Sequence, residues 1–212
     1  MKSLGRVLPL YVVVFIGFVG YSLMITVFTP LLLGDGGGLV SADSSTSTRT
    51  LVLGGLLALY PLAQFFGAPV LGSLSDRFGR RPVLLVSLAA GTCFYALMAL
   101  ALHLQSLPLL ALACLLAGLA EANIAIAQSA IADIAPTAAR SRLFGYVYLS
   151  SSLAYVVGPL AGGKLADPGV VSWFSAPTPF LAVAVLLLAT LALTAARFRE
   201  THAPDPSAPL GL

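Results

Sequence analysis

The sequence predicts an all-α membrane protein with six transmembrane helices. Of its 212 residues, 58% are hydrophobic and only 9% are charged, whereas about 25% of the residues in typical soluble domains are charged. Six apolar segments have the length of roughly 20 residues that a helix needs to cross a bilayer. The basic residues are also distributed unequally between the two sides of a six-span arrangement. The composition indicates a membrane protein, and the last two observations agree on the number of spans.

The six segments form one predicted transmembrane domain over residues 1–200. Their approximate bounds are 8–33, 51–71, 83–102, 107–133, 144–166 and 179–196. The first segment follows a short basic stretch, as in a signal peptide, but its apolar run is too long for one and no cleavage site follows promptly. We therefore expect it to be retained as the first span. Residues 201–212 are polar and Pro-rich and are expected to form a disordered cytoplasmic tail.

The placement of the basic residues predicts the orientation. Nine lie on one side of the six-span arrangement: Lys2, Arg6, Arg77, Arg80, Arg81, Arg140, Arg142, Arg197 and Arg199. Arg49 and Lys164 lie on the other side. By the positive-inside rule, both termini should be cytoplasmic in a multi-pass protein of the plasma membrane or bacterial inner membrane. No basic stripe with interleaved aromatic residues is present, so the expected partner is the lipid bilayer and not nucleic acid.

A weak internal repeat suggests two three-helix units. Residues 69–76 end the second span, and residues 159–167 end the fifth span with a similar pattern and one extra residue. The first copy ends on the cytoplasmic side and the second on the outer side. This is the pattern of an inverted repeat, so we expect two inverted three-helix repeats.

The connection between the second and third spans, residues 72–82, carries the most informative motif. Asp76 lies at the C-terminal end of a helix, where the macrodipole is negative, so its carboxylate needs a positive partner. Gly72 permits close backbone approach, Gly79 permits a tight turn, and Pro82 suits the first turn of a helix. An ordinary charged turn would explain the arginines but not the glycine spacing or the position of Asp76.

This stretch resembles the signature loop of the major facilitator superfamily, G-x-L-[SA]-D-R-x-G-R-[RK]. The resemblance implies half of a major facilitator fold. It also implies a cytoplasmic conformational latch in which Asp76 and Arg80 join charge networks. Asp133, at the cytoplasmic end of the fourth span, is the expected partner of Arg80. The residues assigned to the latch are Gly72, Asp76, Arg77, Gly79, Arg80, Arg81 and Asp133.

Further residues on the fourth and fifth spans resemble the drug–proton antiporter branch, and within it the tetracycline-efflux group. The fifth-span element comprises Gly145, Gly158, Pro159, Gly162 and Gly163. Pro159 cannot donate a backbone hydrogen bond and should weaken or kink the helix, and the glycines should allow close packing. Two departures from the branch weaken the functional transfer: Cys114 replaces an expected arginine, and the first span has no acidic residue.

Glu121 is the one acidic residue near the middle of a span. A charge at the bilayer centre costs about 3 kcal/mol even on insertion scales, so such residues normally face a cavity or a partner. We expect Glu121 to bind and release a proton and to help bind a cationic substrate; a structural brace between helices is the alternative. Gln128 is expected on the same face, and Tyr21 and Thr26 are weaker cavity candidates.

The predicted function is secondary active transport, with proton-coupled export of small amphipathic or drug-like molecules. The resembled family usually has two six-helix halves, so a half-size unit is expected to act as a homodimer or with a second transporter half. The alternative is a non-transporting scaffold, a partner subunit or a truncated fragment. No nucleophilic triad, phosphate loop or metal-ligand cluster is visible in the sequence. We therefore expect neither an enzyme nor a metal or other cofactor, with a proton gradient as the energy source.

Overall fold

The computed structural model describes residues 4–34, 38–41 and 43–205. These residues form α1 (Leu4–Leu33), α2 (Thr46–Phe78), α3 (Arg80–His103), α4 (Leu107–Glu121), α5 (Asn123–Ile134), the 3₁₀ turn η2 (Thr137–Ala139), α6 (Arg140–Ala166) and α7 (Thr178–Arg197). Six helical segments among them are long and apolar enough to cross a membrane, with α4 and α5 sharing one span. The predicted all-α, six-span fold is confirmed, although α2 extends five residues earlier and seven residues later than expected.

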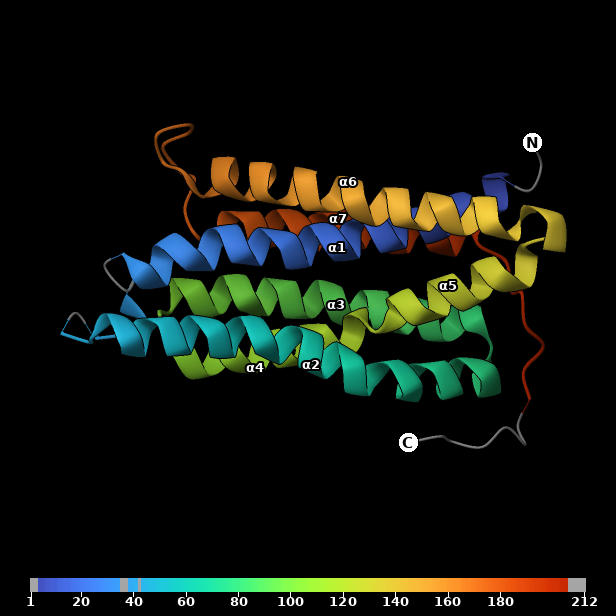
Figure 1. Ribbon diagram of the computed structural model, residues 1–212, viewed down its shortest axis with the longest axis horizontal. Helices are drawn as coiled ribbons and strands as arrows, with labels where there is room; N and C mark the ends of the chain where they lie inside the picture. The colour runs from blue at the N-terminus through green and yellow to red at the C-terminus, as the bar shows by residue number, and fades with distance from the viewer. Residues whose placement is uncertain (1–3, 35–37, 42, 206–212) are drawn as a thin grey trace.

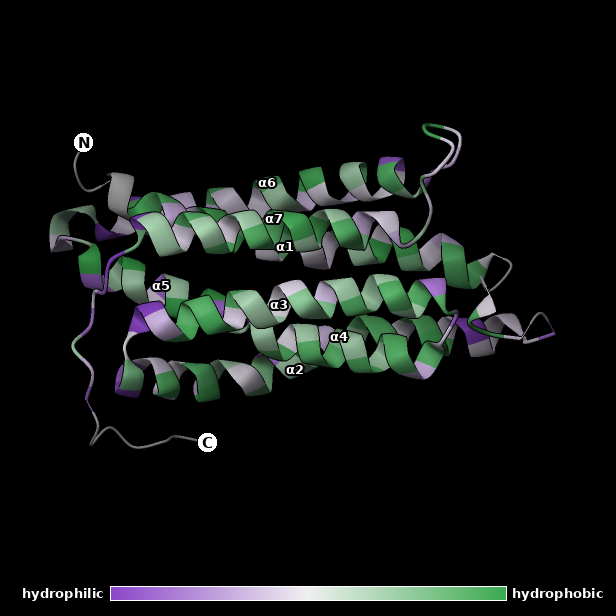
Figure 2. Cartoon of the chain, turned by 180° about the vertical axis from the view of Figure 1, so that it is seen from behind, coloured by the Kyte–Doolittle hydropathy of each residue, from purple (hydrophilic) through white to green (hydrophobic). Residues whose placement is uncertain are grey.

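The helices form an elongated bundle (Figure 1). The α2–α3 turn, the α5–α6 connection and the end of α7 lie at one end of the bundle, and the α1–α2, α3–α4 and α6–α7 connections lie at the other. Hydrophilic residues gather near the two ends, and the middle of the bundle is mostly hydrophobic (Figure 2). This banding is what a bilayer-spanning bundle requires, because an apolar belt faces the lipid tails and polar ends face water.

Two pairs of helices pack through glycine. Gly158 and Gly162 of α6 lie against α1, where a Cβ atom added at Gly158 would be 3.0 Å from the carbonyl oxygen of Val19 and would overlap the Ser22 hydroxyl. Gly118 of α4 lies against α2, where a Cβ would overlap the carbonyl oxygen of Tyr60. Because glycine has no side chain, it lets the backbones of neighbouring helices approach closely.

The contacting pairs also follow the predicted repeat. α1 packs on α6 and α4 packs on α2, while α3 packs on α7. If the two three-helix units are equivalent, α1 corresponds to α4, α2 to α6 and α3 to α7. The α1–α6 pair then corresponds to the α4–α2 pair, and the α3–α7 pair corresponds to itself. The contact pattern is therefore the one expected of two related three-helix units.

The fourth span is interrupted, which the sequence did not lead us to expect. α4 ends at Glu121, Ala122 forms a turn, and α5 begins at Asn123. The N–H of Ala125 bonds to the carbonyl of Ala122 at 3.1 Å, which is a tighter i→i+3 bond, and Figure 1 shows α5 leaving the direction of α4. By contrast, α6 continues unbroken through Pro159.

The segment after α7 turns back along the end of the bundle. The N–H of Asp205 donates to the carbonyl of Asp76 at 3.2 Å, so residues 201–205 follow a defined path beside the α2–α3 turn. The disordered cytoplasmic tail expected from residue 201 stays a prediction, and this backbone bond is a contact that its first five residues make with the α2–α3 end of the bundle. Residues 206–212, and Lys2 at the other terminus, lie outside the described residues.

Candidate substrate and proton site

The carboxyl group of Glu121 is buried at the end of α4, with only 1% of the residue exposed. Its Oε2 atom accepts a hydrogen bond from the hydroxyl of Tyr60 on α2. Its Oε1 atom is buried and has no hydrogen-bond partner among the residues that the structure describes. A buried carboxylate is expensive unless it is paired or hydrogen-bonded. Half of this carboxyl group is therefore satisfied by a phenol and half is left available for a proton.

A second phenol and two glycines complete the surroundings of Glu121. Tyr95 of α3 is fully buried and interacts electrostatically with both Tyr60 and Glu121. From α1, a Cβ atom at Gly17 would lie 3.0 Å from Glu121 Oε2, and one at Gly20 would overlap the hydroxyl of Tyr95. The two glycines thus leave the room that these polar groups occupy. Four helices converge on one carboxyl group.

The break after Glu121 is satisfied by a side chain from α2. The Nε2 atom of Gln64 donates to the backbone carbonyl of Glu121 at 3.2 Å. Carbonyl groups at the end of a helix lack intrahelical partners and need another donor. Tyr60 and Gln64 lie one turn apart on α2, so a single face of α2 binds both the side chain and the main chain of Glu121.

A cavity of about 280 Å³ lies beside this cluster. Tyr60 and Gln64 contribute to its wall together with Tyr21 and Tyr155, and the remaining lining residues are Gly17, Phe18, Pro61 and Ile124. The rings of Tyr21 and Tyr60 stack with centroids 5.1 Å apart, and those of Phe18 and Tyr155 are 5.7 Å apart. Aromatic walls with a few polar groups are typical of small-molecule sites.

The structure brings together only some of the residues that the sequence suggested. Tyr21 lines the cavity. Glu121 does not line it but accepts a hydrogen bond from Tyr60, which does. Thr26 instead lines a separate pocket between α1 and the C-terminal end of α6. Gln128 lies on α5, beyond the interruption at Ala122. Gln128 is not among the residues that line the cavity, and the expectation that it shares a face with Glu121 stays a prediction, because that expectation assumed one uninterrupted helix.

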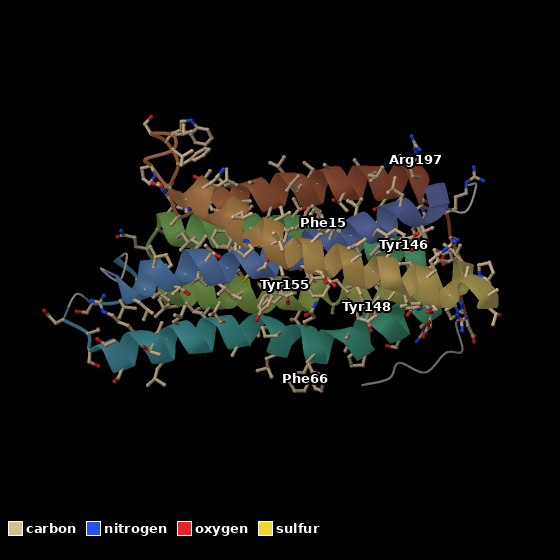
Figure 3. The ribbon with its side chains drawn as sticks, turned by 45° about the horizontal axis from the view of Figure 1, so that its top comes forward. Phe15, Phe66, Tyr146, Tyr148, Tyr155 and Arg197 are labelled. Carbon is tan, nitrogen blue, oxygen red and sulfur yellow. The ribbon has the colours of Figure 1, made fainter. Side chains whose placement is uncertain are left out.

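The cavity lies on the side of the bundle where α2 and α6 are least covered. In the most apolar stretch of each span, only 22% of α6 and 28% of α2 is buried inside the bundle, against 61% of α1. Tyr148 and Tyr155 project from the same side of α6 in the direction of α2 (Figure 3). Tyr148 is 72% exposed and Tyr155 is 46% exposed. This tyrosine-bearing side, between α2 and α6, is the open side of the site.

A second polar cluster lies at the other end of α5. Arg80, the first residue of α3, contacts Asp76 at 2.7 Å and Asp133 at 3.3 Å. It also donates to the Ser75 hydroxyl at 2.7 Å. The positive partner that Asp76 requires is thus in the same chain, and the expected pair between Arg80 and Asp133 is present. One guanidinium links α2, α3 and α5.

Glu200 joins this cluster from the segment after α7. Its carboxylate accepts hydrogen bonds from the backbone N–H groups of Arg80 at 2.9 Å and Arg81 at 3.0 Å, which begin α3. Gly79, with φ of 97°, forms the one-residue connection before α3, and a Cβ there would lie 2.6 Å from Glu200 Oε2. Glycine is therefore required at position 79 for its backbone conformation and for space.

The other residues assigned to the latch are placed less centrally. The Arg81 guanidinium donates to the carbonyl of Ala195 on α7 at 2.9 Å, and that of Arg77 lies 5.8 Å from the ring centre of Phe78. An added Cβ at Gly72 or Gly145 would meet no atom within 4 Å. Among the described residues, no helix approaches Gly72 or Gly145 as closely as expected. A Cβ added at Gly163 would lie 3.7 Å from the Thr26 methyl group, which is ordinary van der Waals contact.

Tyr60, Gln64, Tyr95 and Glu200 were not among the residues singled out from the sequence. Tyr60 and Gln64 had a usable signal, because two polar residues four apart in an apolar span lie on one helix face. Gly17 and Gly20, three residues apart on α1, had a similar signal. Tyr95 and Glu200 depend on contacts between distant segments. Among the described residues, no group of three or more His, Cys, Asp or Glu side chains is arranged to hold a metal ion.

Comparisons with known proteins agree with this architecture. Residues 10–211 match the family model of the Major Facilitator Superfamily. The chain is 42% identical over 202 residues to the class C tetracycline resistance protein of Escherichia coli, covering 95% of this chain and 47% of that protein. It is 40% identical over 148 residues to the class B protein of the same species, covering 70% and 35%. The chain thus spans about half the length of these relatives or less.

Solved structures show the same fold. The human organic anion transporter MFSD10 superposes with a TM-score of 0.78 at 23% identity, over 100% of this chain and 52% of that chain. An inward-open structure of the xylose transporter XylE from E. coli gives a TM-score of 0.69 at 19% identity, over 92% and 48%. The six spans, the signature loop and these matches lead to one conclusion: the chain is a multi-pass integral membrane protein that belongs to the Major Facilitator Superfamily, as an N-terminal half-size segment.

Proposed function

We propose that this chain is part of a proton-coupled secondary transporter that exports small amphipathic or drug-like molecules, with Glu121 as its proton-binding group. The observation that supports this most directly is the buried carboxyl group of Glu121, half satisfied by Tyr60, beside an aromatic cavity. Ionisable residues within membranes mark ion and substrate pathways. The tetracycline resistance proteins to which the chain is similar support export of drug-like molecules as the function.

The proposal gives the cytoplasmic cluster a separate role. Arg80 binds Asp76 and Asp133 from two helices, and these contacts favour the arrangement in which the cytoplasmic ends of α2, α3 and α5 are together. We propose that this network is the conformational latch. The excess of basic residues at the same end supports cytoplasmic placement of both termini.

The proposal also requires a second six-helix unit. α2 and α6 are mostly uncovered in this chain, and the cavity lies on that side. We propose a second copy of the chain as that unit, since a two-fold axis along the membrane normal keeps both copies in one orientation. A separately encoded half is the alternative partner.

The deciding experiment is transport of tetracycline by the reconstituted full chain under an imposed pH gradient. Glu121→Gln keeps the shape of the side chain but cannot bind and release a proton. We expect it to reduce gradient-driven uptake to the level of empty vesicles. Asp43→Asn, the same change at an exposed position of the α1–α2 connection, should leave uptake unchanged.

Two results would count against the proposal. Gradient-driven uptake that persists in Glu121→Gln would remove Glu121 from the coupling step. Absence of uptake by the unmodified chain, alone and with a second half, would instead favour the non-transporting scaffold or fragment.

A further inference from the structure

The side chain of Tyr60 contacts two different environments. Its ring lines the cavity of about 280 Å³ and stacks on Tyr21. Its hydroxyl donates to Oε2 of Glu121. Tyr60 itself is only 2% exposed, so neighbouring side chains hold the ring closely. A change at one end of this rigid side chain must be felt at the other end.

Glu121 does not itself line the cavity. The groups that act on its carboxyl are the phenols of Tyr60 from α2 and Tyr95 from α3. α1 faces it with Gly17. The titratable groups around the cluster are Tyr21 on α1, Tyr60 on α2, Tyr95 on α3, Cys114 on α4 next to Tyr95, and Tyr155 on α6. Tyr60 alone among them both lines the cavity and hydrogen-bonds to Glu121.

We infer that Tyr60 is the positioning residue that couples a ligand in the cavity to the proton on Glu121. The inference rests on the proposed function, in which Glu121 is the proton-binding group. An ionised Glu121 accepts the Tyr60 hydrogen bond as a charge-assisted bond, which is shorter and stronger than a neutral one. A protonated Glu121 has a donor of its own and binds the phenol less strongly. The change in the strength of this hydrogen bond therefore changes the position of the Tyr60 ring, which forms one wall of the cavity.

The cavity also indicates the class of ligand. Its walls carry four aromatic rings, the amide of Gln64 and no charged side chain. Such walls stack on a flat conjugated group and hydrogen-bond to its oxygen or nitrogen substituents. The volume is slightly below the range of about 300–1,000 Å³ for ligand pockets. It therefore holds the flat part of a larger molecule, and the remainder extends toward the open side between α2 and α6.

The test measures tetracycline binding to the full chain in lipid nanodiscs as a function of pH. We expect the dissociation constant of the unmodified protein to change at least about fivefold across the neutral range, the lower end of typical coupling between sites. Tyr60→Phe, which removes only the hydroxyl, should make affinity nearly independent of pH. Tyr155→Phe is the matched control, because Tyr155 lines the same cavity without bonding to Glu121. It should retain the pH dependence.

Glu121→Gln separates failure of the inference from failure of the proposed function. If Glu121→Gln still shows the full pH dependence, Glu121 is not the proton-binding group and both ideas fall. If Glu121→Gln loses the dependence but Tyr60→Phe keeps it, only the coupling role of Tyr60 is overturned.

A second measurement does not require a ligand. The infrared carbonyl band of protonated Glu121, assigned by its loss in Glu121→Gln, should shift in Tyr60→Phe and stay in place in Tyr155→Phe. An unmoved band in Tyr60→Phe would overturn the inference. If Tyr60→Phe does not fold, 3,5-difluorotyrosine at position 60 keeps the ring and hydroxyl while making the phenol more acidic. It should alter the pH dependence of binding, and no alteration would again overturn the inference.

Discussion

The Glu200 carboxylate acts as the cap of a helix that begins 120 residues earlier in the chain. Besides the two N–H groups that begin α3, it accepts bonds from the N–H groups of Thr201 at 2.9 Å and His202 at 3.2 Å. Partial burial alone would raise the pKa of this carboxyl, but the N–H donors of Arg81, His202, Thr201 and Arg80 together hold the pKa below its usual value. The helix macrodipole favours a negative charge at the same place.

This arrangement predicts a pH-dependent contribution to stability. Because the folded-state pKa of Glu200 is lowered, its contribution is present above the ordinary value of 4.5 and is lost as the pH falls through the folded-state pKa. At neutral pH, Glu200→Gln should destabilise by about 1 kcal/mol, as for loss of a helix cap. Thermal unfolding in detergent at several pH values checks this, with Asp43→Asn as the control. A difference from the unmodified protein that grows on acidification would contradict it.

At the scale of elements, glycine determines which helix faces can meet. Gly158 and Gly145 lie on the same helix, α6, but only Gly158 faces α1 closely. Gly158→Ala should destabilise by about 1–3 kcal/mol, as overpacking does. Gly145→Ala should be neutral or stabilising, since alanine favours helix by about 1 kcal/mol over glycine. Melting temperatures of the two variants test this, and equal values would contradict the assigned packing.

The elements were predictable to different degrees. The length of the apolar runs located all six spans, because lipid imposes that length on any helix that crosses it. The interruption at Ala122 was not predictable, since it has no glycine or proline and depends on Gln64 binding the freed carbonyl of Glu121. A kink caused by a side chain from another helix has no local sequence signal.

The site shows the same division. The burial of Glu121 and its need for a partner followed from charge in an apolar span. Its actual partners, Tyr60 and Tyr95, come from two other helices 61 and 26 residues away, and only the packing of those helices identifies them. The pair between Arg80 and Asp133 was expected from the resemblance to a known family, whereas the cap by Glu200 had no comparable motif.

At the scale of the whole molecule, the proposed homodimer brings the α2–α3 turn of one copy near the start of α6 of the other. Gly72→Cys combined with Ser141→Cys, in a background with Cys93 and Cys114 changed to alanine, should then form a disulfide between copies in membranes. An added Cβ at Gly72 meets nothing within 4 Å and Ser141 is exposed, so both positions are accessible.

The control pair combines Val86→Cys with Ser141→Cys. Val86 of α3 is 70% exposed but lies on a helix outside the proposed interface. Electrophoresis without reductant gives the readout. Equal crosslinking by the two pairs, or none by the first, would rule out this dimer and leave a separately encoded half as the partner.

Because the fourth span is interrupted at Ala122, α5 could rotate about that residue relative to α4. Asp133 lies eleven residues from Ala122, which is about 16 Å at a rise of 1.5 Å per residue. A swing of only ten degrees or so would carry the Asp133 carboxylate by about 3 Å, given that helix rise. The contact of 3.3 Å between Arg80 and Asp133 would then open. A small adjustment around the carboxyl group in the middle of the fourth span would thereby be magnified into a broken ion pair at the end of the bundle.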